Sequence, residues 1–169
     1  MFFFIKSKQN NYFTLWKILY NNKGDNMEEK NTKRCIECGA ICNKYTCEEV
    51  FHKILGMEWE YPKLGKEHFK TVACYYIQHP HTYSEEGLND LKKALNENII
   101  QGVETDEIRK RHQIKYNGSK KVREDNCIIK PRNWNITIQD CLDEDGNKIA
   151  EKIVKLANYI IEGIDFNNR

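Results

Sequence analysis

The segment CIECGAICNKYTCEEVFH, residues 35–52, most constrains how this chain folds. It holds four of the seven cysteines and one of the five histidines of the 169 residues. Thiols gathered this closely serve as disulfides, redox groups or metal ligands. The N-terminal apolar run is broken at Lys6, well short of the roughly 7–15 apolar residues of a signal peptide. We therefore expect a cytoplasmic protein, in which clustered cysteines are metal ligands or redox thiols rather than disulfides.

The motif Cys35-x-x-Cys38-Gly39 is typical of a zinc knuckle. Two thiolates three residues apart can bind one ion, and the glycine allows a positive φ that aims backbone N–H groups at the sulfurs. A closed structural site needs four ligands. Cys47 is the better third ligand, because the first turn of a helix favours the thiolate. Cys42 ranks below it, because it follows the knuckle so closely that sharing one ion requires a very tight loop.

A histidine can complete the set. His68 and His79 are eleven residues apart, which is about three helical turns, so they share one helix face. Three turns also separate them by roughly 16 Å, too far for both to bind one ion. His52 lies five residues after Cys47, about 140° around the helix, and points elsewhere.

The candidate metal ligands are therefore Cys35, Cys38, Cys47, His79, His68 and Cys42. Zinc is the ion we favour. A dithiol redox pair, an iron–sulfur cluster and inert cysteines are the alternatives, although a redox CxxC needs a βαβ context that this sequence lacks. Three further cysteines are scattered and are expected to be small apolar side chains; these are Cys74, Cys127 and Cys141.

Helical signals dominate the rest of the chain. Thr46 and Glu49 form a capping box, so a helix should begin at Cys47, and Pro62 and Gly65 mark its stop. Apolar residues at helical spacing predict further helices over about 66–78, 88–99, 105–115 and 148–162. Residues 31–45 are expected to be a loop, 116–132 a loop or short irregular hairpin, and 135–138 a strand or extended lead-in. The prediction is a mainly α fold, with about five helices in a single small domain and an N-terminal Cys-rich, zinc-knuckle-like loop at 35–47.

The first 26 residues raise a separate question. The peptide KGDN before Met27 back-translates, in an AT-rich genome, to a ribosome-binding sequence ahead of a start codon. We interpret residues 1–26 as a mis-translated leader or a disordered extension, and residues 27–169 as the domain. Residues 1–26 carry four lysines and one aspartate, a net charge of +3, so without them the formal charge of +2 becomes −1. Global basicity then gives no argument for nucleic-acid binding.

Four separated motifs occur in order: C-x-x-C-G-A, C-x-x-x-F, H-x-x-x-V-x-x-Y-x-x-Q-H-P and W-x-[VIL]-T-[VIL]-x-D. Together they resemble an uncharacterised bacterial family, domain-of-unknown-function family 5946. The matching positions are Cys35, Cys38, Gly39, Cys47, Phe51, His68, Val72, Tyr75, Gln78, His79, Pro80, Trp134, Thr137 and Asp140. The resemblance covers roughly Cys35 to Glu162, and Cys42 is a departure that the pattern does not require. It implies no activity, and it implies that residues 1–26 lie outside the shared domain.

The resemblance directs attention to Gln78-His79-Pro80-His81. Pro80 ends the helix and holds His79 in its last turn, where the helix dipole favours an imidazolium. Tyr75 and Gln78 are placed to hydrogen-bond its ring. Three roles for His79 are then open. It is a buried histidine that hydrogen-bonds to backbone carbonyls, a zinc ligand, or a general acid–base group.

The last motif is expected to fix the entry of the final segment. We predict that Thr137 or Asp140 caps a helix there and that Trp134 lies in the core.

Three functions follow from these features. We favour a non-catalytic, zinc-stabilised helical domain that binds an unidentified protein partner. The alternative is a metal-dependent or thiol enzyme using His68 or His79 near the cysteine cluster. A further alternative is nucleic-acid binding through the basic stretch 109–132. Charged stretches of this kind are more often solvated helix ends and loops, so a nucleic-acid partner is disfavoured. No run of about 18 apolar residues occurs, so no membrane span is predicted.

Overall fold

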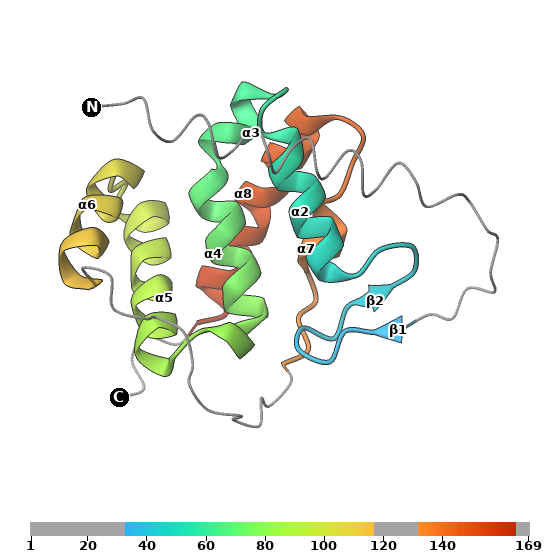
Figure 1. The fold of residues 1–169 in the computed structure, drawn as a ribbon, viewed down its shortest axis with the longest axis horizontal. Helices are drawn as coiled ribbons and strands as arrows, with labels where there is room; N and C mark the ends of the chain where they lie inside the picture. The colour runs from blue at the N-terminus through green and yellow to red at the C-terminus, as the bar shows by residue number, and fades with distance from the viewer. Residues whose placement is uncertain (1–32, 117–131, 165–169) are drawn as a thin grey trace. The chain divides into compact units, whose positions relative to one another are not determined.

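The computed structural model describes residues 33–116 and 132–164 of the chain, and these belong to one compact unit. The predicted mainly α fold is confirmed (Figure 1). In chain order the elements are β1 (Lys33–Arg34), β2 (Ile41–Cys42), α2 (Cys47–Met57), α3 (Pro62–Lys66), α4 (His68–Gln78), a 3₁₀ turn η1 (Pro80–Thr82), α5 (Glu85–Ile100), α6 (Thr105–Tyr116), α7 (Ile138–Cys141) and α8 (Gly146–Glu162). Residues 1–26, with the interpretation placed on them, lie outside the described residues.

The cysteine-rich segment folds as a small hairpin, where a loop was predicted. Strands β1 and β2 pair antiparallel, with Lys33 opposite Cys42 and Arg34 opposite Ile41. Each strand has only two residues, and a two-stranded hairpin alone is marginally stable in water. The hairpin therefore depends on contacts outside itself.

Helix α8 provides the centre of the core. It contacts α2, α3, α4, α5 and α7. Five residues on its inner face have no exposed surface: Ile149, Ile153, Leu156, Ala157 and Ile160. Burying a side chain the size of isoleucine stabilises the fold by ~1.5–3 kcal/mol. The apolar stripe predicted for 148–162 is thus the principal packing surface of the domain.

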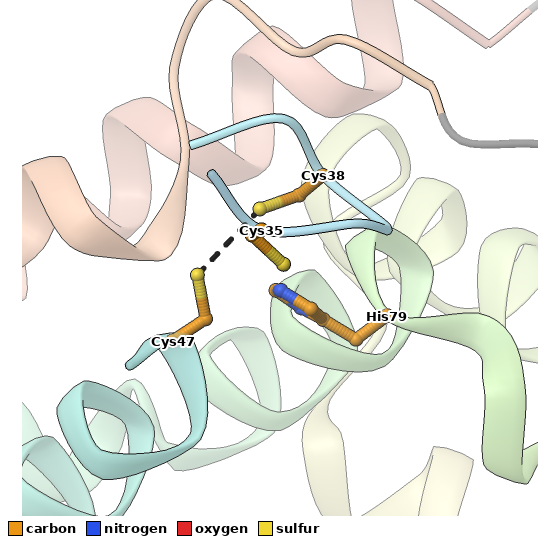
Figure 2. A group of neighbouring side chains, drawn as sticks. All are labelled: Cys35, Cys38, Cys47 and His79. Atoms are coloured by element: carbon orange, nitrogen blue, oxygen red, sulfur yellow. Dashed lines mark hydrogen bonds between the residues drawn. The ribbon is translucent and has the colours of Figure 1, made fainter. Parts of the chain in front are cut away.

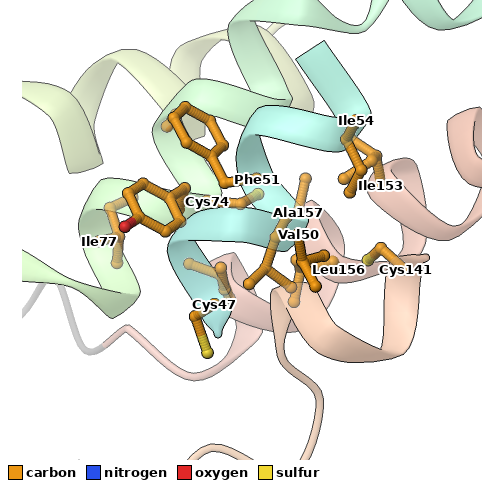
Figure 3. Close-up of a cluster of buried hydrophobic side chains, with 14 of the residues drawn as sticks. Cys47, Val50, Phe51, Ile54, Cys74, Ile77, Cys141, Ile153, Leu156 and Ala157 are labelled. Carbon is orange, nitrogen blue, oxygen red and sulfur yellow. The ribbon is translucent and has the colours of Figure 1, made fainter. Parts of the chain in front are cut away.

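Helices α2 and α4 pack on this core and on each other (Figure 3). Val50 and Ile54 of α2 are fully buried, and so is Cys74 of α4. The Phe51 ring stacks on the Tyr75 ring with centroids 4.0 Å apart. This contact fixes how the N-terminal half of α2 lies against the C-terminal half of α4, which are the helix ends that matter for the site.

The helix start predicted at Cys47 is confirmed, and the prediction for Pro62 is wrong. Thr46 and Glu49 form the capping box at α2, and Ser84 accepts a hydrogen bond from the Gly87 amide at the start of α5. Pro62, predicted to end a helix, instead opens the short helix α3. Proline is well suited to the first turn, because its missing N–H would have no helical partner there.

Residues 135–137 are a lead-in and not a strand, and Ile138 already belongs to helix α7. The lead-in ends in the one-turn helix α7, where Thr137 donates its backbone N–H to Asp140 over 2.8 Å. The helix cap predicted for this pair is confirmed. Trp134 was predicted to lie in the core, but it is half-buried. Its ring lies against the ring of Tyr159 and the guanidinium of Arg132.

Helix α6 lies beside α5 and is joined to it by ion pairs of Arg111 and Lys115, and its Ile108 is buried (Figure 1). Between the two helices Gly102, which follows the end of α5, has a φ of +67°. Among residues 33–116 and 132–164, none of the helices combines the length and apolar character needed to cross a bilayer.

Candidate metal centre

Four ligand atoms from distant parts of the sequence converge at one end of the helices. They belong to Cys35 and Cys38 of the hairpin, Cys47 at the start of α2 and His79 at the end of α4, and all lie within 4.8 Å of one another. Figure 2 shows the three sulfurs and the imidazole edge pointing toward a common centre. Cys38, Cys47 and His79 are each at most 4% exposed. The arrangement is compatible with a metal site.

The hairpin turn presents its two sulfurs through a tight backbone loop. Cys35 N–H donates to Ala40 over 2.8 Å, and Gly39 N–H donates to the Cys35 carbonyl over 3.0 Å. Gly39 has a φ of +76°, which confirms the positive φ predicted for it. Any side chain here would be strained, and its Cβ would lie 2.3 Å from the Asn133 Oδ1 atom. The glycine therefore allows the turn and the close approach of the 132–134 segment.

Cys47 owes its position to the capping box. Thr46 accepts from the Glu49 amide over 3.1 Å, and the Glu49 carboxylate accepts from the Thr46 amide over 2.9 Å. This fixes Cys47 as the first helical residue of α2, where the helix dipole favours a negative charge on its sulfur. The Cys47 and Cys38 sulfurs are 3.6 Å apart.

His79 is held in one orientation by its own helix and by stacked rings. Its Nδ1 atom lies 2.9 Å from the Tyr75 carbonyl, so Nδ1 carries the proton and donates. The Tyr75 ring stacks on the imidazole with centroids 4.4 Å apart, and Phe51 stacks behind Tyr75. The other nitrogen, Nε2, is buried and makes no hydrogen bond to any residue that the structure describes. A buried polar atom without a partner costs about 1–3 kcal/mol, so Nε2 is an atom suited to bind a metal ion.

Charge in the cluster is shared unequally. The Cys47 thiol donates to Cys38 and so lowers the Cys38 pKa to about 4, while the same bond raises the pKa of Cys47. Burial raises the pKa of Cys35. Burial also acts to lower the pKa of His79, but Cys38 and the Tyr75 carbonyl outweigh it and the pKa is raised. These shifts favour a thiolate at Cys38 and thiols at Cys35 and Cys47, whose protons a bound cation would displace.

Cys42 lies beside the group of four but outside it. Its sulfur is 3.8 Å from that of Cys47. The Gln139 side chain reaches both sulfurs, since its Nε2 lies 3.4 Å from Cys42 Sγ and 3.7 Å from Cys47 Sγ. The same amide donates to the Tyr45 carbonyl over 2.8 Å. One amide therefore bridges two thiols and anchors the loop between them.

His68 lies outside the cluster as well. Its Nδ1 atom pairs with the Glu58 carboxylate over 2.7 Å, where α2 ends. His52 is exposed on α2. Cys74 and Cys141 are core residues, and burial raises the pKa of both thiols; Cys127 lies outside the described residues. Of the two histidines considered for a shared ion, the structure places His79 with the cysteines.

Two side chains link α7 to α4 and the hairpin to η1 through partners that the sequence analysis did not predict. Gln78 was expected to bond the His79 ring, but its amide instead donates to the Ile136 carbonyl over 2.8 Å and accepts from the Ile138 amide over 3.2 Å. Glu37, between the knuckle cysteines, accepts from the backbone and from the ring of His81 over 3.1 and 2.8 Å. Both residues bond to partners that no local sequence pattern indicates.

Two cations in the described part of the basic stretch 109–132 are paired with acidic residues of α5. Arg111 lies 2.5 Å from the Glu97 carboxylate, and Lys115 lies 2.5 Å from that of Asp90. Residues 117–131 of the stretch lie outside the described residues.

Comparison with known proteins identifies the family. The profile described as "Family of unknown function (DUF5946)" matches residues 33–164. The chain therefore belongs to this family, and the resemblance read from the motifs is confirmed. Neither a curated protein nor a solved structure matches the chain.

Proposed function

We propose that this member of family DUF5946 binds one zinc ion through Cys35, Cys38, Cys47 and His79. The ion holds the hairpin to the helices, and the result is a non-catalytic, zinc-stabilised helical domain that binds a protein partner. The observation that carries the proposal is the convergence of four ligand atoms within 4.8 Å of one another, one of them a buried imidazole nitrogen without a hydrogen-bond partner.

The distances within the cluster support a single ion. Zinc–sulfur bonds of about 2.3 Å in a tetrahedron place two sulfurs about 3.8 Å apart, and the Cys38 and Cys47 sulfurs are 3.6 Å apart. The tautomer of His79 also fits. Its Nδ1–H donates to a backbone carbonyl, which leaves the Nε2 lone pair for a metal, and this is how zinc-bound histidines are usually oriented.

The donor set favours zinc over other ions. Thiolate and imidazole together suit zinc, whereas magnesium, calcium and manganese prefer oxygen ligands. Iron–sulfur clusters are usually held by four cysteines, and here one of the four donors is a histidine. Three thiolates and a neutral imidazole would leave the zinc complex with a net charge of −1.

A structural role follows from the number of donors. Catalytic zinc keeps one coordination position open for water, whereas four protein ligands close the site. The hairpin also needs support, because its strands are two residues long and it contributes only Cys38 and Ala40 to the buried core. Of the two histidines named for the enzyme alternative, His68 is paired with Glu58 away from the cluster, and His79 would be the fourth ligand of a closed site.

The surface of the hairpin supports a protein partner. Ile36 and Ile41 are 83% and 54% exposed, on the two sides of the knuckle turn. A zinc-held hairpin would present these apolar side chains in a fixed geometry. We therefore assign the partner contact to this hairpin.

Metal content tests the proposal. The full chain is purified without chelator or nickel resin, and its metals are counted by elemental mass spectrometry. We expect about one zinc per chain, lost in a Cys35→Ser/Cys38→Ser variant whose hairpin amides then exchange rapidly with solvent. Cys141→Ser is the matched control, because it removes a buried thiol away from the cluster and should retain the zinc. A metal-free wild-type chain, or iron in place of zinc, would contradict the proposal.

A further inference from the structure

The cluster contains one thiol more than a tetrahedral site needs. Cys42 is not among the four converging ligands, yet its sulfur is 3.8 Å from that of the ligand Cys47. It is also absent from the motifs that define the family resemblance. An additional thiol in van der Waals contact with a metal ligand calls for an explanation that metal binding does not provide.

Exposure separates Cys42 from two of its neighbours. Cys38 and Cys47 are buried, whereas Cys42 at the end of β2 is half-buried, as is the ligand Cys35. In the zinc-loaded chain the three ligand sulfurs are bonded to the ion, so Cys42 is the thiol of the cluster that retains its lone pairs and is reached from solvent. An oxidant would therefore react with the Cys42 sulfur before the other sulfurs of the cluster.

The Gln139 amide holds the two sulfurs together. Its Nε2 donates to the Tyr45 carbonyl over 2.8 Å and reaches the sulfurs of Cys42 and Cys47 at 3.4 and 3.7 Å. A donor shared by two sulfurs stabilises negative charge on either one and limits their rotation. A disulfide requires a sulfur–sulfur distance of about 2.05 Å, so the two atoms need to close by less than about 2 Å.

We propose that Cys42 and Cys47 form a peroxide-sensitive redox pair whose disulfide expels the zinc ion; this rests on the proposed zinc site. The Cys42 thiolate attacks one oxygen of hydrogen peroxide, the O–O bond breaks, and sulfenic acid and hydroxide form. The Cys47 sulfur, whose bond to the zinc ion would break, then attacks the sulfenic sulfur; the S–S bond forms, the S–O bond breaks and hydroxide leaves. Two thiols are oxidised, and one peroxide is reduced to two waters once protons are taken up.

The consequence is a switch in the hairpin. Cys47 in a disulfide is no longer a thiolate donor, so three ligands remain and the closed site opens. The new disulfide joins the end of β2 to the start of α2, but the zinc-mediated link of Cys35 and Cys38 to Cys47 and His79 is lost. The knuckle turn with the exposed Ile36 is then no longer held in its zinc-bound geometry. A thiol reductant reverses the step by transferring two electrons to the disulfide, and zinc can bind again.

The sequence allows the disulfide to be mapped directly. Trypsin cleaves after Lys44, which separates residues 35–44 from residues 45–53. The zinc-loaded full chain is exposed to hydrogen peroxide while a chromogenic chelator reports the zinc set free. Remaining thiols are alkylated under denaturing conditions, and the digest is analysed by mass spectrometry. We expect zinc release together with a linked pair of these peptides in which Cys35 and Cys38 are alkylated.

Three variants complete the test. Cys42→Ser should bind zinc as the wild type does and release it in peroxide at least tenfold more slowly, whereas Cys141→Ser should release it at the wild-type rate. Gln139→Leu should slow the formation of the linked peptides. Release from Cys42→Ser at the wild-type rate, or a link between Cys38 and Cys47, overturns the proposal. A chain that carries no zinc overturns the proposed function itself, whereas a zinc-loaded chain that keeps its zinc in peroxide overturns only the switch.

Discussion

Replacing Gln78 with methionine tests how α4 holds the segment that leads to α7. Gln78 is 1% exposed. Its amide donates to the Ile136 carbonyl over 2.8 Å, and its carbonyl accepts from the Ile138 amide over 3.2 Å. Methionine has nearly the same volume and flexibility but forms neither bond. The substitution therefore removes the two hydrogen bonds without leaving a large cavity.

The expected loss of stability follows from the two groups left behind. A buried donor or acceptor without a partner costs about 1–3 kcal/mol. Ile138 has no exposed surface, so its N–H carries the full penalty, whereas Ile136 is half-buried and water reaches its carbonyl. Together these give a loss of about 2–4 kcal/mol in the free energy of unfolding. With a urea dependence of about 2 kcal/mol/M, the midpoint falls by about 1–2 M.

The assay is urea unfolding of the zinc-saturated chain, followed by circular dichroism at 222 nm. Gln113→Met is the matched control, because Gln113 is exposed on α6, and its midpoint should stay within about 0.25 M of the wild type. A Gln78→Met midpoint as close to the wild type as that of the control would refute the argument that this side chain holds the backbone of 136–138.

Three further predictions concern the site and its supports. Gly39→Ala should weaken zinc binding about tenfold, because a left-handed conformation costs other residues roughly 1–2 kcal/mol. Competition with a chelator measures the zinc affinity of this variant and of the helical control Gly56→Ala. Equal affinity in the two variants would contradict the prediction. Thr46→Ala should lower the stability by about 1 kcal/mol through loss of the capping box, and an unchanged thermal midpoint would exclude that role for the threonine. Zinc binding at pH 7 should release at least about two protons. The pKa values of Cys35 (raised by burial) and Cys47 (raised by its bond to the Cys38 sulfur) keep both as thiols until zinc displaces the proton, and the raised pKa of His79 adds part of a third. The affinity should then rise at least about 100-fold per pH unit near neutrality. Calorimetry in buffers of different ionisation enthalpy counts the protons, and a release below one would disprove the assignment of charge.

The predictions that the structure confirms rest on patterns between residues that are close together in the sequence. The capping box of Thr46 and Glu49 is complete within four residues, and the stripe on α8 depends only on the helical period, so both are visible without knowledge of the tertiary structure. The positive φ of Gly39 follows from the knuckle motif for the same reason. Pro62 shows the limit of such signals, because proline is found both after a helix and at the first position of one.

The contacts that assemble the site depend on partners far apart in the sequence. Gln139 lies 97 residues from Cys42, and Gln78 lies 58 residues from Ile136. Neither pairing leaves a periodic or motif signal, because each is a single side chain bonding to backbone or sulfur across the fold. The spacing of His68 and His79 limited the site to one histidine, but which end of α4 meets the hairpin is decided by how α2 and α4 pack, through Phe51 on Tyr75.

The most direct test of the central claim is X-ray absorption spectroscopy of the purified chain at the zinc edge. The account predicts about three sulfur ligands at about 2.3 Å and one nitrogen at about 2.0–2.1 Å. The same spectrum from Cys42→Ser should be unchanged, because Cys42 is not one of the four ligands. A shell of four sulfurs, a shell rich in oxygen or nitrogen, or the absence of zinc would contradict the account.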